Sequence, residues 1–309
     1  MINRLRARAT GLILNLAKRA LKSLLAEPVW ASPDQLGKAE SFKDRAREVI
    51  SDPINILIKR VPNAGFVDSQ GMVILHNGNR VPCIGDKAYY GEFSDLLIFN
   101  RGVHEPLEEF SFQEVLKKIK SKNPIMIELG SYWAHYSMWF LKELQGAIAI
   151  CVEPEINALE IGKHNFQLNG LEGIHINAGI GNDGVSLQNI FDSQGLNQVC
   201  LLHCDIQGAE AEMLAGAKFI FESQKVDYAF ISTHSETLHS EVVKQLQGFG
   251  YRIEISSPFD HHTTSCDGFV LAVAPAVEEV FQGFSPLGRV EILESSPSRI
   301  VTFLSKISQ

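Results

Sequence analysis

The sequence has no excess of basic charge. Its 309 residues include 28 lysines and arginines against 36 aspartates and glutamates, so the formal net charge at pH 7 is −8. Proteins that bind nucleic acid carry a basic patch or field, because phosphate contacts supply much of the affinity. We therefore expect no nucleic-acid partner.

Cysteine is scarce and shows no disulfide framework. The five cysteines are odd in number and do not follow the spacing of a small secreted scaffold. Cys151 and Cys200 lie in apolar, strand-like runs, where a reduced and buried thiol is the ordinary state. We expect a cytoplasmic protein with free cysteines.

Long apolar runs are also missing. Residues 11–17 form an apolar stretch that is too short to span a bilayer. They belong to a basic amphipathic segment, residues 1–26, in which leucines recur at roughly helical spacing and no acidic residue occurs. Such a helix can lie on an anionic membrane surface, or it can dock on its own protein or on a second subunit of a homo-oligomer. We favour docking.

The stretch around which the chain is organised is PIMIELGSYWAHYS, residues 124–137. It begins with an apolar run that is typical of a strand buried on both faces of a parallel sheet. Glu128 stands where this strand should end, and aromatic residues recur at helical spacing from Tyr132 onward. The pattern predicts a strand, a tight turn and a helix, with an acidic residue at the edge of the sheet where ligands bind.

This turn lacks the glycine triplet of a dinucleotide-binding loop. Only Gly130 is in place, and Ala134 occupies the third glycine position. A carboxylate at Glu128 would repel a phosphate, whereas it would suit a ligand that carries an ammonium and a sulfonium group. The alternative is a strand-end glutamate that acts only as a charge at the helix terminus.

Beyond this stretch, strands and helices alternate. We expect strands at residues 147–152, 173–180, 199–206, 226–233, 251–256 and 268–274, with helices between most of them. The last two have no helix between them, which implies an antiparallel edge strand. The expected fold is an α/β doubly wound, seven-stranded, mostly parallel sheet of the Rossmann-like kind.

The hydrophobic content of 45% and a mean hydropathy near zero suit one large domain with extensions. We expect a helical extension at residues 1–60, a cap segment at 61–122, the main domain at 123–275, and a tail packed on that domain at 276–309. A hairpin is expected within the cap, on either side of residues 77–79.

A second acidic residue follows the second expected strand. Glu153 lies about 20 residues after the turn, where a carboxylate can accept hydrogen bonds from both hydroxyls of a ribose. Nicotinamide enzymes share this feature, but together with Glu128 and the missing glycines it indicates a nucleoside without phosphate. S-adenosylmethionine fits, and its adenine would lie near Ile180 and Asn182, after the third strand.

The chain from about residue 89 to 275 resembles the FkbM-type S-adenosylmethionine-dependent methyltransferases. The resemblance rests on IELGSYWAHYSMWF, CVEPEINALEIGKHNFQLNG, HCDIQGAEAEMLAGA and ISTHSE, with NRGVHEPLEE upstream, all in family order. It implies the class I methyltransferase fold and transfer of a methyl group, usually to oxygen, on a small molecule, a sugar or a natural product. By position it assigns the methionine end of the cofactor to Glu128, Gly130, Ser131 and the neighbouring Tyr132, and the ribose to Glu153.

Three positions depart from the family pattern. Glu128 stands where many members carry aspartate, Gln207 where many carry glutamate, and Ala134 replaces a glycine. The first two leave cofactor binding in place but put a metal role for Gln207 in doubt.

Methyl transfer to a hydroxyl also needs a group that removes a proton. His203 and Asp205 lie two apart on the fourth strand, so they share one face, and Asp205 is at its mouth, where it can contact the cofactor or the acceptor. His234 closes the fifth strand, titrates near neutrality, and is our first candidate for the general base, with His203 second. The alternative is a magnesium site formed by Asp205 and His234 with Glu236 or Glu210.

The side of the site that would contact the methyl acceptor, called here the acceptor wall, is the part of the site that the sequence defines least. Four residues are candidates for contact with the substrate, two from the cap motif and two from the loop before the last strand: His104, Glu105, His261 and His262. Two other function classes stay open at this point. One is a nicotinamide oxidoreductase on the same sheet, which would require the glycine triplet that this turn lacks. The other is a nucleoside-binding protein that has lost catalysis.

Overall fold

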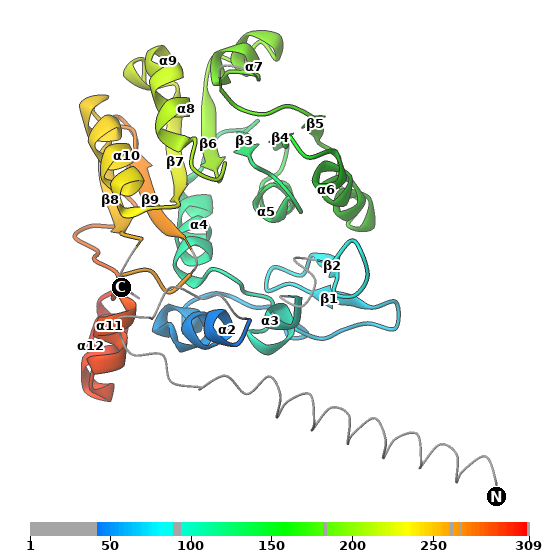
Figure 1. Cartoon of the computed structure of the whole chain (residues 1–309), viewed down its shortest axis with the longest axis vertical. Helices are drawn as coiled ribbons and strands as arrows, with labels where there is room; N and C mark the ends of the chain where they lie inside the picture. The colour runs from blue at the N-terminus through cyan, green and yellow to red at the C-terminus, as the bar shows by residue number, and fades with distance from the viewer. Residues whose placement is uncertain (1–41, 89–93, 182–183, 260–261, 266, 308–309) are drawn as a thin grey trace, which may run out of the picture. The chain divides into compact units, whose positions relative to one another are not determined.

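A sheet of seven strands forms the centre of the molecule (Figure 1). The structure, a computed structural model, describes residues 42–88, 94–181, 184–259, 262–265 and 267–307, all within one compact unit. The strands are β3 (Ile125–Leu129), β4 (Ile148–Val152), β5 (Ile174–Ile176), β6 (Val199–Cys204), β7 (Val226–Thr233), β8 (Arg252–Ser257) and β9 (Gly268–Val273). Their order across the sheet is β5-β4-β3-β6-β7-β9-β8.

The first five of these strands run parallel, and β9 is antiparallel to both of its neighbours, β7 and β8. The expected α/β doubly wound mixed sheet is therefore confirmed, and edge strand β8 is paired antiparallel. The order of the last two strands in the sheet differs from their order in the chain, because β9 lies between β7 and β8. The strand order reverses between β3 and β6, and the carboxyl ends of these two strands form the crevice where ligands bind in such sheets.

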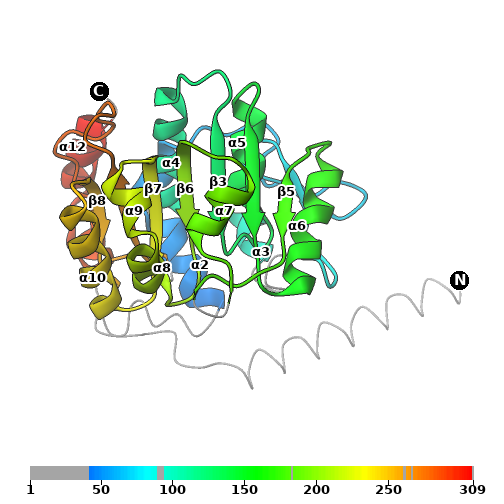
Figure 2. The same ribbon diagram turned by 90° about the horizontal axis from the view of Figure 1, so that it is seen from above.

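Helices cover both faces of the sheet (Figure 2). One face is covered by α7 (Leu187–Ser193), α8 (Glu210–Gly216), α9 (Lys218–Glu222) and α10 (Glu236–Gly248), and the other by α4 (Pro106–Lys118), α5 (His135–Glu143) and α6 (Ile156–Leu168). Alternate residues of β3 serve the two cores: Ile127 and Leu129 pack with α7 to α10, and Met126 packs with the aromatic residues of α4 and α5. This double burial explains why the strands have no polar alternation.

The segment before α4 lies below α4, α5 and α6 in the view of Figure 1. It contains α2 (Phe42–Ser51), the 3-10 helix η2 (Pro53–Ile56), α3 (Ser94–Phe99) and a two-stranded antiparallel sheet, β1 (Met72–Ile74) with β2 (Arg80–Pro82). The expected hairpin is therefore present. Ile54 and Ile58 are buried in the same cluster as Phe110 and Phe112 of α4, so this segment shares its core with the main sheet.

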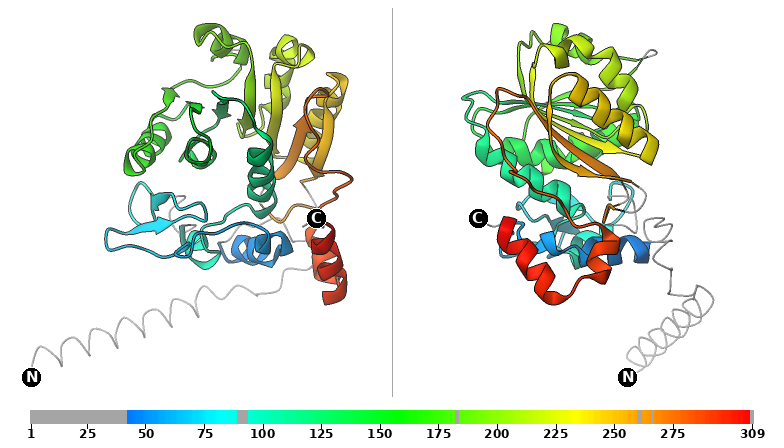
Figure 3. Two further views of the ribbon diagram at one scale, coloured as in Figure 1. Left: turned by 180° about the vertical axis from the view of Figure 1, so that it is seen from behind. Right: turned by 90° about the vertical axis from the view of Figure 1, so that its left-hand side faces the viewer.

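Two helices end the chain, α11 (Arg289–Glu294) and α12 (Pro297–Ile307) (Figure 3). Phe303 and Ile307 of α12 pack against the cluster that contains Ile54. The tail therefore packs on the rest of the chain as helices. No helix in the described part of the chain is both long and apolar enough to cross a membrane.

The four cysteines in the described residues, Cys83, Cys151, Cys200 and Cys204, are buried and free, as expected for reduced thiols. The basic segment at residues 1–26 lies outside the described residues, so its docking stays a prediction. The domain boundaries at 60, 122 and 275 also stay predictions.

Candidate functional site

The turn after β3 has an unusual backbone. Gly130, Tyr132 and Ala134 all have positive φ, of 75°, 38° and 59°. For residues with a side chain this left-handed conformation costs roughly 1–2 kcal/mol each, and such outliers gather at functional sites. A Cβ atom at position 130 would lie 1.7 Å from the carbonyl oxygen of Asp205, so only glycine allows the turns after β3 and β6 to touch.

A pocket of about 680 Å³ opens beside this turn, at the carboxyl ends of β3, β4 and β6. Its volume lies in the range of small-molecule sites. Among the described residues that line it, six are acidic and none is lysine or arginine. The acidic residues are Glu105, Glu128, Glu153, Glu155, Asp205 and Asp267. The pocket therefore favours a cationic ligand and disfavours a phosphate.

The two expected glutamates both line the pocket. Glu128 is 2% exposed, and its Oε2 accepts a hydrogen bond from the backbone N–H of Ser137 at 3.0 Å. Burial raises the pKa of the Glu128 carboxyl, and the neighbouring His203 opposes this shift. Glu153 accepts hydrogen bonds from the backbone N–H groups of Tyr132 and Glu155, each at 3.0 Å, so it also holds the turn in place.

The other expected cofactor positions lie nearby. Gly130, Ser131, Tyr132 and Ile180 all line the same pocket. The hydroxyl of Ser131 is buried and makes no hydrogen bond to a described residue, so it is available to a ligand. Asn182 lies outside the described residues.

His203 lies on β6 directly opposite Glu128 on β3, and it also lines the pocket. Its Nε2 is 2.6 Å from Oε1 of Glu108, and the ring of Tyr136 covers it with a centroid separation of 4.2 Å. Burial raises the pKa of Glu108 well above its ordinary value and lowers that of His203. Both shifts favour a neutral pair in which the Glu108 carboxyl donates to the imidazole, so His203 already has its hydrogen-bond partner.

A second histidine, His234, follows β7 and contacts three carboxylates. Its Nε2 is 3.1 Å from Asp205 and 3.5 Å from Asp267, and its Nδ1 is 3.1 Å from Glu210. Burial opposes a charge on this ring, but the hydrogen bonds to Asp205 and Glu210 raise its pKa to about 10. The imidazole therefore carries a proton at neutral pH, which does not suit the general-base role expected from the sequence.

Three of these side chains, Asp205, His234 and Asp267, have the composition of a metal site. One ligand atom each from Asp205, His234 and Asp267 all lie within 4.8 Å of one another. Asp267, rather than the expected Glu236, completes the group. Ser235 caps α10 by accepting a hydrogen bond from Leu238, which places Glu236 in the exposed first turn of that helix. Glu210 contacts His234 but also binds the backbone N–H groups of Ile206 and Gly208.

The cap motif reaches the pocket through His104 and Glu105, which both line it. His104 is 3.1 Å from Glu105 and 2.6 Å from Glu109. Burial would lower its pKa, but the two carboxylates raise it to about 10. The hydroxyl of Tyr136 donates to Glu105 at 3.2 Å, which connects the cap to α5.

Of the two loop residues that were expected to meet the substrate, His262 does not line the pocket. His262 has its Nδ1 3.0 Å from the hydroxyl of Ser257, and its backbone carbonyl accepts from Arg289. It therefore packs the loop against the start of α11. His261 lies outside the described residues.

Residues at this site that sequence reasoning missed include Glu108, Tyr136 and Asp267. Glu108 belongs to the motif NRGVHEPLEE and Tyr136 to the motif IELGSYWAHYSMWF. Both residues therefore lie within the motifs on which the family resemblance rests. The only available signal was the density of acidic and aromatic residues there. Asp267 had no local signal, because its contact with His234 depends on the insertion of β9 beside β7.

Comparison with known proteins gives similarity at the level of structure. No protein-family model matches the chain, and no curated protein matches it. The resemblance to the FkbM family therefore stays a prediction.

The solved structures that it resembles include TrmK of M. capricolum in complex with S-adenosylhomocysteine, with 17% identity, a TM-score of 0.38, and coverage of 64% of this chain and 82% of that one. The METTL16 methyltransferase domain has 13% identity and a TM-score of 0.41, and the match covers 66% of this chain and 87% of that one.

A third similar structure is the tRNA (uracil-54, C5)-methyltransferase of Pyrococcus abyssi in complex with S-adenosylhomocysteine. It has 12% identity and a TM-score of 0.38, and the match covers 54% of this chain and 38% of that one. The expectation that this chain binds no nucleic acid has no support from these similarities.

Proposed function

We propose that the chain is an S-adenosylmethionine-dependent methyltransferase. The observation that carries the proposal is the pocket at the strand ends, which is lined by six acidic residues and, among the described residues, by no lysine or arginine. A sulfonium nucleoside with an ammonium group matches this charge. A nicotinamide dinucleotide does not, because its pyrophosphate would meet Glu128 and Glu153 with no lysine or arginine among the described lining residues to offset them.

Each part of the cofactor has a residue to hold it. Glu128 and the free hydroxyl of Ser131 bind the methionine end, beside the turn that contains Gly130 and Tyr132. Glu153 binds the ribose hydroxyls while it keeps its two backbone hydrogen bonds. Ile180, together with Asn182, contacts the adenine. Asp205 lies across the pocket and orients the ammonium group or the acceptor.

The acceptor is a hydroxyl of a small molecule, a sugar or a natural product, positioned in line with the methyl group. Positioning of this kind can account for roughly 7–11 kcal/mol of the barrier. His104 and Glu105 form the acceptor wall. Asp205 lines the pocket and His234 does not, so Asp205 takes the acceptor's proton and His234 holds that carboxylate in position.

A second candidate is a metal-assisted version of the same reaction. It is favoured by the grouping of Asp205, His234 and Asp267, which would hold a divalent cation. The imidazole nitrogen makes manganese a better match than magnesium, which prefers oxygen ligands alone. When bound, such a cation would lower the pKa of the acceptor hydroxyl. In this version Asp205 and His234 are ligands, and the cofactor contacts of the proposal are unchanged.

The test is calorimetric titration of the full chain with S-adenosylhomocysteine and, separately, with NAD⁺. We expect binding of S-adenosylhomocysteine and no binding of NAD⁺; the reverse result would reject the proposal. Protein that binds S-adenosylhomocysteine but transfers a labelled methyl group to no fraction of a small-molecule extract would instead be a nucleoside-binding protein. Assays with and without EDTA then separate the metal-free reaction from the metal-assisted one.

A further inference from the structure

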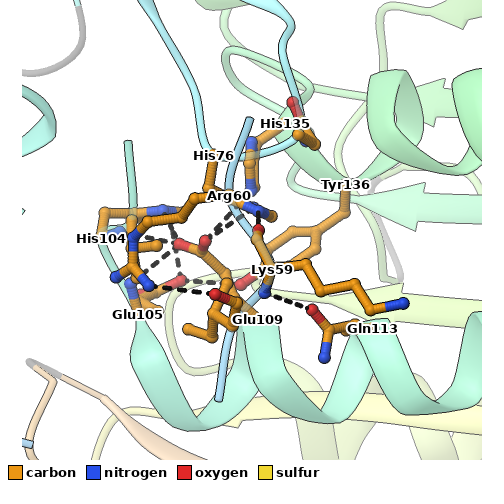
Figure 4. Close-up of polar contacts among 12 residues, drawn as sticks. Lys59, Arg60, His76, His104, Glu105, Glu109, Gln113, His135 and Tyr136 are labelled. Atoms are coloured by element: carbon orange, nitrogen blue, oxygen red, sulfur yellow. Dashed lines mark hydrogen bonds and ion pairs between the residues drawn. The ribbon is translucent and has the colours of Figure 1, made fainter. Parts of the chain in front are cut away.

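A second cluster of titratable side chains lies outside the pocket (Figure 4). It consists of His76, in the turn between β1 and β2, Glu109 on α4, and His135, the first residue of α5. Their exposed fractions are 1%, 0% and 1%. None of them lines the pocket described above. The cluster therefore connects the β1–β2 hairpin, α4 and α5.

The two oxygens of Glu109 have different surroundings. Oε1 accepts hydrogen bonds from the backbone N–H groups of His104 at 2.7 Å and of Glu105 at 3.1 Å. Oε2 is also buried. It lies 2.9 Å from Nε2 of His76 and 3.9 Å from Nε2 of His135. One oxygen is thus fully satisfied, and the other faces two imidazoles.

The contact between His76 and Lys59 indicates which ring nitrogen of His76 carries the hydrogen when the ring is neutral. Its Nδ1 is 3.4 Å from the carbonyl oxygen of Lys59. A carbonyl only accepts, so Nδ1 carries the hydrogen and a neutral ring keeps a lone pair on Nε2. This is the arrangement in which a histidine usually binds a metal, with the second nitrogen donating to a carbonyl.

His135 is the least satisfied group of the three. Neither of its ring nitrogens makes a hydrogen bond to a described residue, although the ring of Trp133 stacks on it at 4.9 Å. Burial lowers the pKa of His135, which keeps the imidazole neutral. The Nε2 of His135, and that of His76 when its ring is neutral, then presents a lone pair to a carboxylate oxygen in a buried space. Such unsatisfied groups require an explanation, and an ion between them is one.

We propose that His76, His135 and Glu109 bind a divalent transition-metal cation, for which zinc is the best match. Imidazole nitrogen and carboxylate oxygen are common zinc ligands. The three ligand atoms lie within 4.8 Å of one another, and neighbouring ligands of a tetrahedral zinc with bonds of ~2.0–2.1 Å are roughly 3.3 Å apart. Small side-chain rotations therefore close the site.

His104 acts as a positioning residue for this site. Its Nδ1 is 2.6 Å from Oε1 of Glu109, so it orients the carboxylate whose other oxygen binds the ion. Because His104 also lines the pocket, the metal would fix the cap against the ligand-binding crevice. The metal site does not depend on the proposed methyl transfer. The competing explanation is a shared proton between His76 and Glu109 in place of the ion.

The test is the metal content of the full chain, purified without a histidine tag, incubated with Zn²⁺ and dialysed. We expect about one zinc per chain, and zinc absorption spectra with two imidazole ligands at Zn–N distances of ~2.0–2.1 Å. The cation site at Asp205 offers only one imidazole, so the number of imidazoles distinguishes the two sites. Removal of zinc with a strong chelator should lower Tm by roughly 5 °C or more.

Two variants and a control complete the test. His76→Asn keeps a nitrogen near the position of Nδ1 and removes Nε2, and Glu109→Gln removes the charge; each should lose at least nine-tenths of the bound zinc. His239→Asn is the control, because His239 is also buried but both of its nitrogens have hydroxyl partners, and it should keep the zinc. Wild-type protein with less than a tenth of a zinc per chain, or zinc lost through Asp205→Asn instead, would overturn the proposal.

Discussion

Gly130 and Asp205 are in backbone contact, since a Cβ at position 130 would lie 1.7 Å from the Asp205 carbonyl oxygen. Gly130→Ala must therefore separate the turns after β3 and β6, in addition to the cost of an alanine at φ 75°. We expect a loss of at least about 3 kcal/mol of unfolding free energy, measured by urea denaturation, and loss of S-adenosylhomocysteine binding.

Gly170→Ala is the matched control for this substitution. Gly170 also has a positive φ, of 65°, but a Cβ there would meet no atom within 4 Å. Its loss should be limited to about 1–2 kcal/mol, the cost of the left-handed backbone alone. Equal losses in the two variants would show that contact with Asp205 has no energetic role.

Glu153→Gln should weaken cofactor binding without unfolding the chain. The substitution removes the charge that accepts from the ribose hydroxyls, and glutamine keeps one oxygen as an acceptor for the backbone N–H groups of Tyr132 and Glu155. A charge-assisted hydrogen bond contributes ~1.5–3 kcal/mol, which corresponds to a rise in Kd of about 10- to 100-fold. Calorimetry with S-adenosylhomocysteine measures it. Glu160→Gln, on the exposed face of α6, is the control, and a similar rise in both variants would contradict the assignment.

The alternation of strands and helices could be predicted because the parallel strands are buried on both faces. Residues 226–233 were expected as a strand and form β7 over the same range. Glu128 and Glu153 were also predictable, since Glu128 is the last residue but one of β3, Glu153 directly follows β4, and the carboxyl ends of these apolar strands must reach the crevice. Local pattern was sufficient in these cases.

Contacts between distant segments could not be predicted. Nothing in the sequence of β9 indicates that it inserts beside β7, and that insertion brings Asp267 to His234 in place of Glu236. The buried group around Glu109 is a similar case, because its histidines come from a turn and from a helix start that no periodicity connects.

The backbone conformation at the expected third glycine position could not be predicted either. Ala134 adopts the left-handed conformation there, with φ of 59°.

His234→Gln should lower turnover while leaving cofactor affinity within about twofold. His234 contacts Asp205 but does not line the pocket, so its loss releases the carboxylate that faces the acceptor. We expect kcat to fall by about 10²- to 10³-fold, within the range for loss of a proton-transfer group, with a nearly unchanged Kd for S-adenosylhomocysteine. A parallel rise in that Kd would place His234 in cofactor binding instead.

Asp52→Asn should change how stability depends on pH. Asp52 caps η2 by accepting from Ile54 N–H, and its other oxygen accepts from the hydroxyl of Thr264. Burial raises the pKa of Asp52 from 3.8 to about 6, although both hydrogen bonds oppose the shift. The folded state therefore binds this proton more tightly than the unfolded state does. The resulting stability is fully present below pH 3.8 and is lost as the pH rises through about 6.

The size of the effect follows from the shift of about two pKa units, which corresponds to about 3 kcal/mol. Asparagine keeps an acceptor for Ile54 and can donate to Thr264, so the fold is retained while the titration disappears. Urea denaturation of both proteins between pH 4 and pH 7 should show the wild type losing about 3 kcal/mol relative to Asp52→Asn, with no further divergence above pH 7. Asp192→Asn, at an exposed position, controls for the loss of one charge. If the curves of Asp52→Asn and the wild type stayed parallel, Asp52 would be ionised in the folded protein throughout this range, and burial would not govern its titration.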